Sequence, residues 1–174
     1  MKIRDGIIDK DFLRKHRFYD TFLHFGIDDE QLAQYFEKHF LDEIINFNEL
    51  IPQTIEVLEY LKEKGYQLHV VSNGFHEVTN RKVEKSGLKK YFETVTSAED
   101  AHAMKPDERI FEYSLNLANA EKAESVFIGD DWVADVKGAQ NFGLDIIFFD
   151  ALKENKSEEG LKTIQNLEEI KNFL

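Results

Sequence analysis

Three aspartates lie within six residues of one another, at Asp130, Asp131 and Asp135. The first two follow an apolar run, residues 125–128, which predicts a buried strand that ends at Gly129. Carboxylates this close raise each other's pKa unless a cation or a hydrogen-bond donor joins them. A hard cation such as Mg²⁺ prefers oxygen ligands and would meet that need. The alternative is structural, with Asp131 capping the next helix and Asp135 favouring its dipole.

A second polar group closes an earlier strand. The apolar run at 66–72 predicts a buried strand, and it ends in Ser72, Asn73 and Gly74. A hydroxyl, an amide and exposed backbone N–H groups at a strand-to-helix junction are suited to binding phosphate. Ser-Asn-Gly is also an ordinary turn sequence, so this motif alone is a weak signal.

Lys105 lies between these two groups, directly before Pro106 and the start of a helix. A lysine in this position can extend to solvent, as most lysines do. Alternatively, its ammonium reaches into a cleft, holds a carboxylate and balances a phosphate. Ligands of open parallel sheets bind beyond the carboxyl ends of the strands, so all three groups are expected at one edge.

Strands and helices alternate from Pro52 onward, which predicts an α/β fold: a Rossmann-like parallel sheet with helices on both faces. The strands are expected at 66–72, 94–96, 125–128 and 146–149. Helices are expected from Pro52 to just before Gly65, over 77–85, from Pro106 to Ala118, and from Asp131 to Phe142. The spacing of Ile164, Leu167, Ile170 and Phe173 predicts a short amphipathic helix at the end of the chain.

The first 50 residues differ from the rest and predict an aromatic-rich helical hairpin. Its first helix, 11–25, carries the apolar residues Phe12, Tyr19, Phe22 and Leu23. Its second helix follows the capping pair Asp28-Asp29 and repeats Leu32, Phe36, Phe40 and Ile44 every fourth residue. Residues 1–50 are therefore expected to form a small helical cap-like segment, and residues 51–174 the α/β core.

Composition narrows the classes of protein. Thirty-four acidic against 22 basic side chains give a formal charge of -12, which argues against nucleic-acid binding. No cysteine is present, so disulfides, thiolate metal sites and cysteine nucleophiles are excluded. No apolar run is long enough to cross a membrane, and the first residues have no signal-peptide pattern. A cytoplasmic location is the default expectation.

The order of the three motifs is more specific than any one of them. A strand with Ser72, then Lys105-Pro106, then Gly129-Asp130-Asp131 with Asp135, resembles the haloacid dehalogenase (HAD) superfamily of hydrolases. The resemblance implies that Ser72, with Asn73 and Gly74, binds the phosphoryl group and that Lys105 is catalytic, steadying the nucleophile and intermediate. It implies that Asp130 binds Mg²⁺ with Asp131 or Asp135 assisting, and that Asp135 helps to position the metal or the lysine. The hairpin is similar to the small helical cap of many members.

The first motif of that family, a strand followed by Asp-x-Asp-x-Thr, is not recognised in the sequence. Asp9-Lys10-Asp11 has the Asp-x-Asp spacing, but only Gly6-Ile7-Ile8 precedes it, which is too short for a buried strand. The core is therefore expected to lack its first strand and with it the attacking aspartate. The chain is then an N-terminally shortened hydrolase, one completed by a second polypeptide, or a non-catalytic module.

These observations favour a magnesium-dependent phosphatase scaffold for a small phosphorylated metabolite, with little or no activity of the 174-residue chain alone. The alternative is a non-catalytic binding or interaction module with the same fold. A missing central strand would expose sheet edges, which a homodimer or a strand-donating partner would cover.

Overall fold

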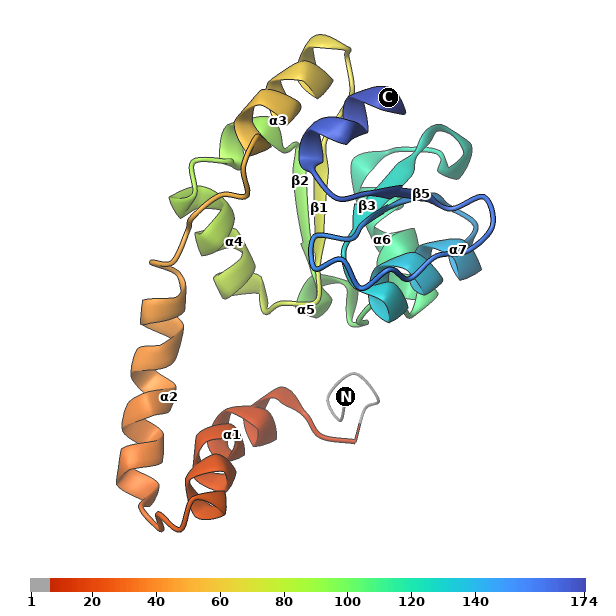
Figure 1. Cartoon of the computed structure of the whole chain (residues 1–174). Coiled ribbons are helices and arrows are strands. Elements are labelled where there is room, and N and C mark those ends of the chain that lie inside the picture. Colours follow the sequence, from red (N-terminus) through yellow and green to blue (C-terminus); the bar gives the residue numbers. More distant parts are fainter. Residues whose placement is uncertain (1–6) are drawn as a thin grey trace. The chain divides into compact units, whose positions relative to one another are not determined.

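The computed structural model describes residues 7–174. These residues form two compact units, and the boundary between the units lies between Asn48 and Glu49 (Figure 1). Residues 1–6 of the cap-like segment lie outside the described residues. None of the described helices combines the length and apolarity that a membrane span requires.

The first unit is a helical hairpin of α1 (Lys10–His24) and α2 (Glu30–Ile44). Each helix starts at an aspartate whose carboxylate accepts a backbone N–H three residues on: Asp9 from Phe12 at 2.7 Å, and Asp29 from Leu32 at 2.8 Å. Such caps satisfy N–H groups that have no partner inside the helix. The expected hairpin is therefore present, with both starts determined by short acidic side chains.

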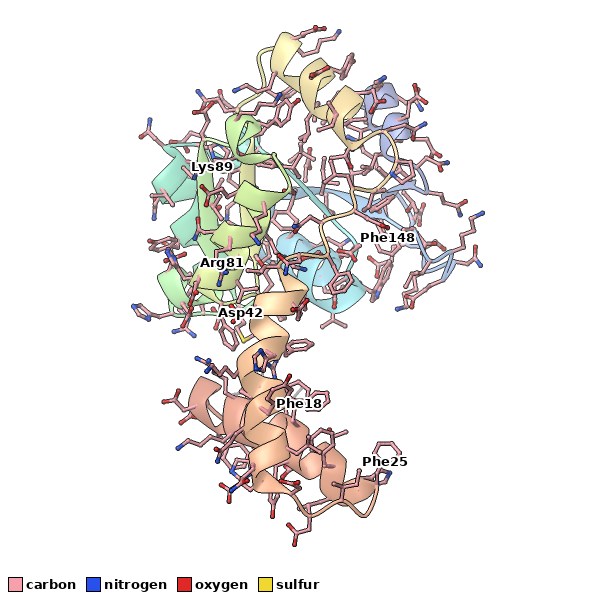
Figure 2. All side chains as sticks on the ribbon, turned by 90° about the vertical axis from the view of Figure 1, so that its left-hand side faces the viewer. Phe18, Phe25, Asp42, Arg81, Lys89 and Phe148 are labelled. Atoms are coloured by element: carbon pink, nitrogen blue, oxygen red, sulfur yellow. The ribbon has the colours of Figure 1, made fainter. Side chains whose placement is uncertain are left out.

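Phenylalanine rings join the two helices. Phe18 and Phe22 of α1 contact Phe36 of α2 with ring centroids 5.8 and 5.3 Å apart, and Phe18 also contacts Phe40 at 5.4 Å (Figure 2). The predicted stripe on α1 was partly wrong. Phe12 stacks instead on His16 within α1, and the Tyr19 hydroxyl donates to Asp28. Phe18 and Phe22 are four residues apart and so share the packed face.

The second unit is an α/β core, as the alternating pattern predicts. Its elements, with α for α-helices and η for 3₁₀- or π-helices, are α3 (Thr54–Glu63), β1 (His69–Ser72), α4 (His76–Lys85), η1 (Lys89–Tyr91), β2 (Thr94–Ser97), α5 (Ala98–Ala101), α6 (Glu108–Ala118), η2 (Lys122–Glu124), β3 (Val126–Gly129), η3 (Trp132–Lys137), α7 (Gly138–Phe142), β4 (Asp145–Phe149), β5 (Lys162–Ile164) and η4 (Leu167–Asn172).

The strands form two parallel groups. β1 pairs with β2, placing Ser72 opposite Ser97, and β3, β4 and β5 form a three-stranded sheet in that order. Among residues 7–174, β1 and β3 exchange no ladder hydrogen bonds. The described part of the chain therefore shows no direct pairing between the strands that end at Ser72 and at Gly129.

Alternate residues of β4 face opposite layers, as the period of a strand requires. Ile146 and Phe148 belong to an apolar cluster with Phe111 of α6 and Ala139 of α7. Ile147 and Phe149 belong to a second cluster, which includes Val57 and Leu61 of α3 and Ile170 of η4. Helices thus cover both faces of the sheet, and this three-layer arrangement fixes the strand ends that carry the polar motifs.

Several expected boundaries were wrong. The strand expected at 66–72 begins only at His69, and Ile164 belongs to β5 rather than to a terminal helix. Pairing with β4 explains the second difference, because Ile164 lies opposite Phe149 and buries its side chain there. The helix expected after Asp131 begins as the π-helix η3 and becomes α-helical only at Gly138.

The first testable prediction concerns His69, whose Nδ1 lies 2.8 Å from Thr94 Oγ1 across β1 and β2. Burial lowers the pKa of His69 below its ordinary value, and Lys62 adds to this while Glu93 opposes it. The unfolded chain therefore binds a proton first as the pH falls. We expect the free energy of unfolding to decrease as the pH drops from 6.5 toward the folded-state pKa.

Urea unfolding at a series of pH values between 8 and 5 measures this dependence. The control is His69→Asn, which keeps a polar side chain but does not titrate. An unchanged pH dependence in the variant over that interval would show that His69 is not responsible.

Candidate active site

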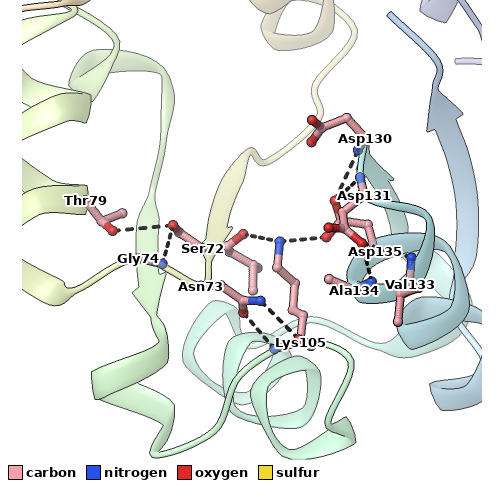
Figure 3. A network of polar contacts seen from close by, with 11 residues as sticks. Ser72, Asn73, Gly74, Thr79, Lys105, Asp130, Asp131, Val133, Ala134 and Asp135 are labelled. Atoms are coloured by element: carbon pink, nitrogen blue, oxygen red, sulfur yellow. Dashed lines mark hydrogen bonds and ion pairs between the residues drawn. The ribbon is translucent and has the colours of Figure 1, made fainter. Parts of the chain in front are cut away.

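The carboxyl ends of the strands bring the predicted site residues together. Ser72 is the last residue of β1 and Gly129 the last of β3, and Lys105 lies in the segment before α6 (Figure 3). All of these belong to the second unit, so their arrangement follows from one packed core. The edge expected from strand order is therefore the edge where the polar groups meet.

Lys105 does not extend to solvent. Its residue is 9% exposed, and its ammonium lies 2.7 Å from Asp135 Oδ1 and donates to the backbone carbonyl of Val71 at 3.0 Å. The contact with Asp135 is an ion pair rather than a directed hydrogen bond, because Oδ1 has no hydrogen-bond partner among the described residues. One ammonium thus links β1 of the first sheet to η3, which follows β3 of the second.

Asn73 holds the backbone on either side of Lys105. Its side-chain oxygen accepts the Lys105 N–H at 2.7 Å, and its side-chain amide donates to the Lys105 carbonyl at 3.0 Å. This pairing joins the loop after β1 to the segment before α6. It occupies both ends of the Asn73 amide, and the geometry therefore favours a positioning role over direct contact with a ligand.

Ser72 and Gly74 form a tight turn. The Gly74 N–H donates to Ser72 Oγ at 3.0 Å, and the hydroxyl of Thr79, in α4, lies 3.4 Å from the same oxygen. A Cβ on Gly74 would meet Thr79 Oγ1 at 2.7 Å, which is closer than two such atoms can approach. Glycine is therefore required here to let α4 approach the strand end.

The three aspartates have different surroundings. Asp131 is the N-cap of η3, where its Oδ1 accepts the N–H groups of Val133 at 2.9 Å and Ala134 at 2.7 Å. Asp135 is 3% exposed and its Oδ2 accepts the N–H groups of Asp130 at 3.1 Å and Asp131 at 3.0 Å. The capping role considered for Asp131 is therefore real. Asp135 folds back onto the strand end and orients it.

Gly129 is required by the same packing. A Cβ at this position would lie 2.5 Å from the carboxylate carbon of Asp135. A larger residue would push that carboxylate away from the two N–H groups that it holds. The Gly-Asp-Asp sequence and the aspartate four residues after it are thus one structural unit.

Asp130 is the aspartate best suited to a metal. Its residue is exposed, and its carboxylate makes no hydrogen bond or ion pair within the part of the chain that the structure describes. No group of three or more histidine, cysteine, aspartate or glutamate side chains among residues 7–174 could hold a metal ion. Mg²⁺ commonly uses one or two carboxylates and keeps its waters, so the exposed carboxylate of Asp130 has the surroundings that suit this ion.

The Asp9-Lys10-Asp11 sequence has a structural role. Asp9 is the N-cap of α1 and Asp11 lies in the first turn of that helix. This pair begins a helix in the first unit, and the two described residues before it, 7 and 8, are not part of a strand.

One polar network near the site was missed from the sequence. Asp100 and Ser97 form a capping box at the start of α5, and Asp100 Oδ1 lies 2.7 Å from His76 Nδ1 at the start of α4. Burial raises the pKa of Asp100, but hydrogen bonds from Ser97 and His76 outweigh this and leave it below its ordinary value. The Ser-x-x-Asp spacing at 97–100 was the signal that could have revealed the box.

Comparison with known proteins identifies the family. The profile of haloacid dehalogenase-like hydrolases matches residues 10–149, which is most of the chain. The chain belongs to that family, and the resemblance drawn from its motifs is confirmed.

Curated relatives include three phosphatases of small molecules. The chain is 32% identical over 110 residues to ribulose-1,5-bisphosphate 5-phosphatase of Halopiger xanaduensis, covering 63% of this chain and 46% of that protein. It is 30% identical to pyrimidine 5'-nucleotidase PynA of Streptococcus pneumoniae, covering 82% and 60%. It is also 30% identical to glyceraldehyde 3-phosphate phosphatase of Methanothermobacter thermautotrophicus, covering 71% and 58%. The chain thus spans about half the length of these relatives.

Solved structures share the fold. The HAD-hydrolase YfnB of Bacillus subtilis, in a magnesium-bound crystal form, superposes with a TM-score of 0.88 at 22% identity, covering 99% of this chain and 75% of that one. A 2-haloacid dehalogenase of Pseudomonas syringae gives a TM-score of 0.71 at 26% identity, covering 98% and 77%. The α/β fold expected from the sequence is therefore confirmed.

The second prediction concerns the pair of Lys105 and Asp135, whose side chains are 11% and 4% exposed. Removing one partner of a buried ion pair leaves the other charge uncompensated, at a cost of about 3–5 kcal/mol. We expect Lys105→Met to lower the free energy of unfolding by roughly this amount, as measured by urea denaturation.

Lys137→Met is the matched control, because Lys137 pairs with Glu158 where both side chains are more than a third exposed. Loss of an exposed pair is expected to cost about 0–1 kcal/mol. Equal losses in the two variants would contradict the buried, linking role of Lys105.

Proposed function

We propose that this chain carries most of the active site of a magnesium-dependent phosphatase that acts on a small phosphorylated metabolite. The observation that carries the proposal is the meeting of Ser72, Lys105 and Asp130 at one edge of the core (Figure 3). Membership of a hydrolase family and three phosphatase relatives support it. The relatives differ in their named substrates, so the proposal is limited to the phosphoryl group.

In this proposal the loop after β1 binds the phosphoryl group. Ser72 contributes its hydroxyl, while Asn73 and Gly74 give the loop its shape through the bonds to Lys105 and Ser72. Lys105 is the catalytic residue of this chain. Its ammonium, fixed between Asp135 and the Val71 carbonyl, stabilises negative charge that develops beside it.

Asp130 and Asp131 are proposed to hold Mg²⁺, and Asp135 to assist by holding their backbone N–H groups. The ion would supply positive charge against the phosphoryl oxygens. The chain has a formal charge of -12, so a local cation is the means by which an anionic substrate is accepted. The same overall charge argues against nucleic-acid binding. A cytoplasmic location is part of the same proposal.

The attacking carboxylate is proposed to come from outside this chain. Aspartyl-phosphate chemistry needs a carboxylate oxygen that attacks phosphorus while the bond to the leaving alcohol breaks. Lys105 cannot supply that attack, and the oxygens of Asp135 already contact Lys105 and two backbone N–H groups. A strand between β1 and β3, whose facing edges exchange no ladder bonds in the described part of the chain, would bring such a group next to Lys105.

The third prediction tests this assignment with the 174-residue chain. We expect hydrolysis of p-nitrophenyl phosphate to be weak or absent, with or without magnesium, because the attacking group is missing. Inorganic phosphate is nevertheless expected to bind in the presence of magnesium, and Ser72→Ala and Asp130→Asn are each expected to weaken that binding. Isothermal titration calorimetry measures the affinity.

Two results would contradict the assignment. Ready magnesium-dependent hydrolysis that is lost in Asp130→Asn would place the complete machinery within this chain. Phosphate binding that is unchanged in Ser72→Ala would remove the proposed phosphoryl site.

A second candidate function is a non-catalytic binding or interaction module. It is favoured by the same open edges of β1 and β3, because unpaired strand edges recruit other strands. The partner would be a second copy of this chain or a strand-donating polypeptide. Under this alternative the strand ends that carry Ser72, Lys105 and Asp130 still bind a phosphorylated molecule but do not hydrolyse it.

The fourth prediction separates a self-complementing assembly from an isolated chain. If a second copy covers the open edges, the mass in solution is expected to rise from 20.4 kDa to twice that value as concentration increases. Light scattering after size-exclusion chromatography makes this measurement. A strict monomer with a single cooperative unfolding transition would exclude the homodimer.

A further inference from the structure

The hydroxyl of Ser72 lies against one backbone N–H and one further hydroxyl. The backbone N–H of Gly74 points at Ser72 Oγ from 3.0 Å, and the Thr79 hydroxyl reaches the same oxygen from α4 at 3.4 Å, which is long for a pair of hydroxyls (Figure 3). A backbone N–H can only donate, so the direction of the first bond is certain. Thr79 is 7% exposed and its hydroxyl needs a buried acceptor.

A serine hydroxyl accepts two hydrogen bonds and donates one. With Gly74 and Thr79 as donors, both acceptor positions of Ser72 are taken. The proton of Ser72 is then the remaining group, and no bond from it to another described residue is present. The Ser72 hydroxyl, which could otherwise donate or accept, is thereby left to act as a hydrogen-bond donor.

We propose that Thr79 is a positioning residue that fixes Ser72 as a hydrogen-bond donor toward an anionic oxygen of the ligand. The close approach of α4 makes this contact, and Gly74 permits it because any Cβ there would meet Thr79 Oγ1 at 2.7 Å. Thr79 acts through Ser72 and does not touch the ligand. The identification of that oxygen as a phosphoryl oxygen rests on the proposed function.

The sequence gives no direct indication of this role. Thr79 lies seven residues after Ser72, and three structural conditions bring the two side chains together. The strand must end at Ser72, the helix must start at His76, and the first turn of that helix must face back toward β1. Packing of α4 against β2 provides that orientation. The hydroxyl is then buried on the inner side of the helix, where a valine would pack equally well but could not donate.

The experiment compares Thr79→Val, which removes the hydroxyl at nearly constant shape, with Thr79→Ser, which keeps it. Thr163→Val in β5 is the matched control for the loss of a threonine hydroxyl elsewhere. Two quantities are measured on the full chain: the affinity for inorganic phosphate in magnesium, by calorimetry, and the hydrogen-exchange rate of the Gly74 amide, by NMR.

We expect Thr79→Val to weaken phosphate binding by about threefold to tenfold, the range for loss of one hydrogen bond, and to speed exchange of the Gly74 amide. Thr79→Ser should restore both, and Thr163→Val should change neither. In a Ser72→Ala background, Thr79→Val should have no further effect on affinity, because the two residues act through one hydroxyl. If Thr79→Val does not fold, Thr79→Ala takes its place in the same comparison.

Two outcomes overturn the proposal. Unchanged Gly74 exchange in Thr79→Val would show that Thr79 does not position Ser72, whether or not phosphate binds. Tighter phosphate binding in Thr79→Val would show that Thr79 accepts the Ser72 proton instead of directing it outward. If the unaltered chain binds no phosphate at all, the proposed function fails, and the exchange measurement still decides the role of Thr79.

Discussion

The position of one ammonium group holds the candidate site together. Lys105 Nζ contacts a backbone carbonyl of β1 and a carboxylate that follows β3, and these belong to two strand groups without a shared hydrogen-bond ladder among the described residues. A lysine buried this far costs free energy unless it is paired, and Asp135 provides the pair. Asn73 also fixes the position of Lys105, because its side-chain amide bonds to both the N–H and the carbonyl of that residue.

The orientation of the other polar groups follows from that contact. Asp135 uses one oxygen for the ammonium and the other for the N–H groups of Asp130 and Asp131, so the strand end cannot shift without disturbing Lys105. The backbone of Asp130 is held in this way, while its carboxylate makes no hydrogen bond or ion pair with any described residue. The arrangement gives three similar side chains three different surroundings: the Asp130 carboxylate is exposed, the Asp131 carboxylate caps η3, and the Asp135 carboxylate is buried.

Sequence patterns were sufficient for the fold and for placing the polar motifs at strand ends, because both depend on local signals. Apolar runs that end in Ser72 or Gly129 mark strand ends, and ligands of open parallel α/β folds bind beyond the carboxyl ends of the strands. The residue spacing could not show that Asp135 turns inward. An aspartate that interacts with the helix dipole and an aspartate that folds back onto the strand end occupy the same position in the sequence. The contact of Thr79 with Ser72 and the β-strand at Ile164 depend on packing between distant segments. Expectations based on helical spacing failed for Ile164 because its pairing with β4 outweighs local periodicity.

The edges of β1 and β3, which exchange no ladder bonds among the described residues, also explain why a charged side chain lies at this point of the core. Strand edges inside a core carry N–H and C=O groups that need partners, and leaving them buried without partners is costly. The Lys105 ammonium satisfies one of these carbonyls, that of Val71, at the end of the edge where the polar motifs meet. A further strand would satisfy the rest by ladder bonds, and a carboxylate at its end would then lie beside an ammonium that already has one acidic partner. An ammonium between two carboxylates stabilises both in their charged form. The same lysine therefore has a role with or without the further strand. Without it, Lys105 links the two strand groups, and with it, Lys105 is the cation beside an attacking carboxylate.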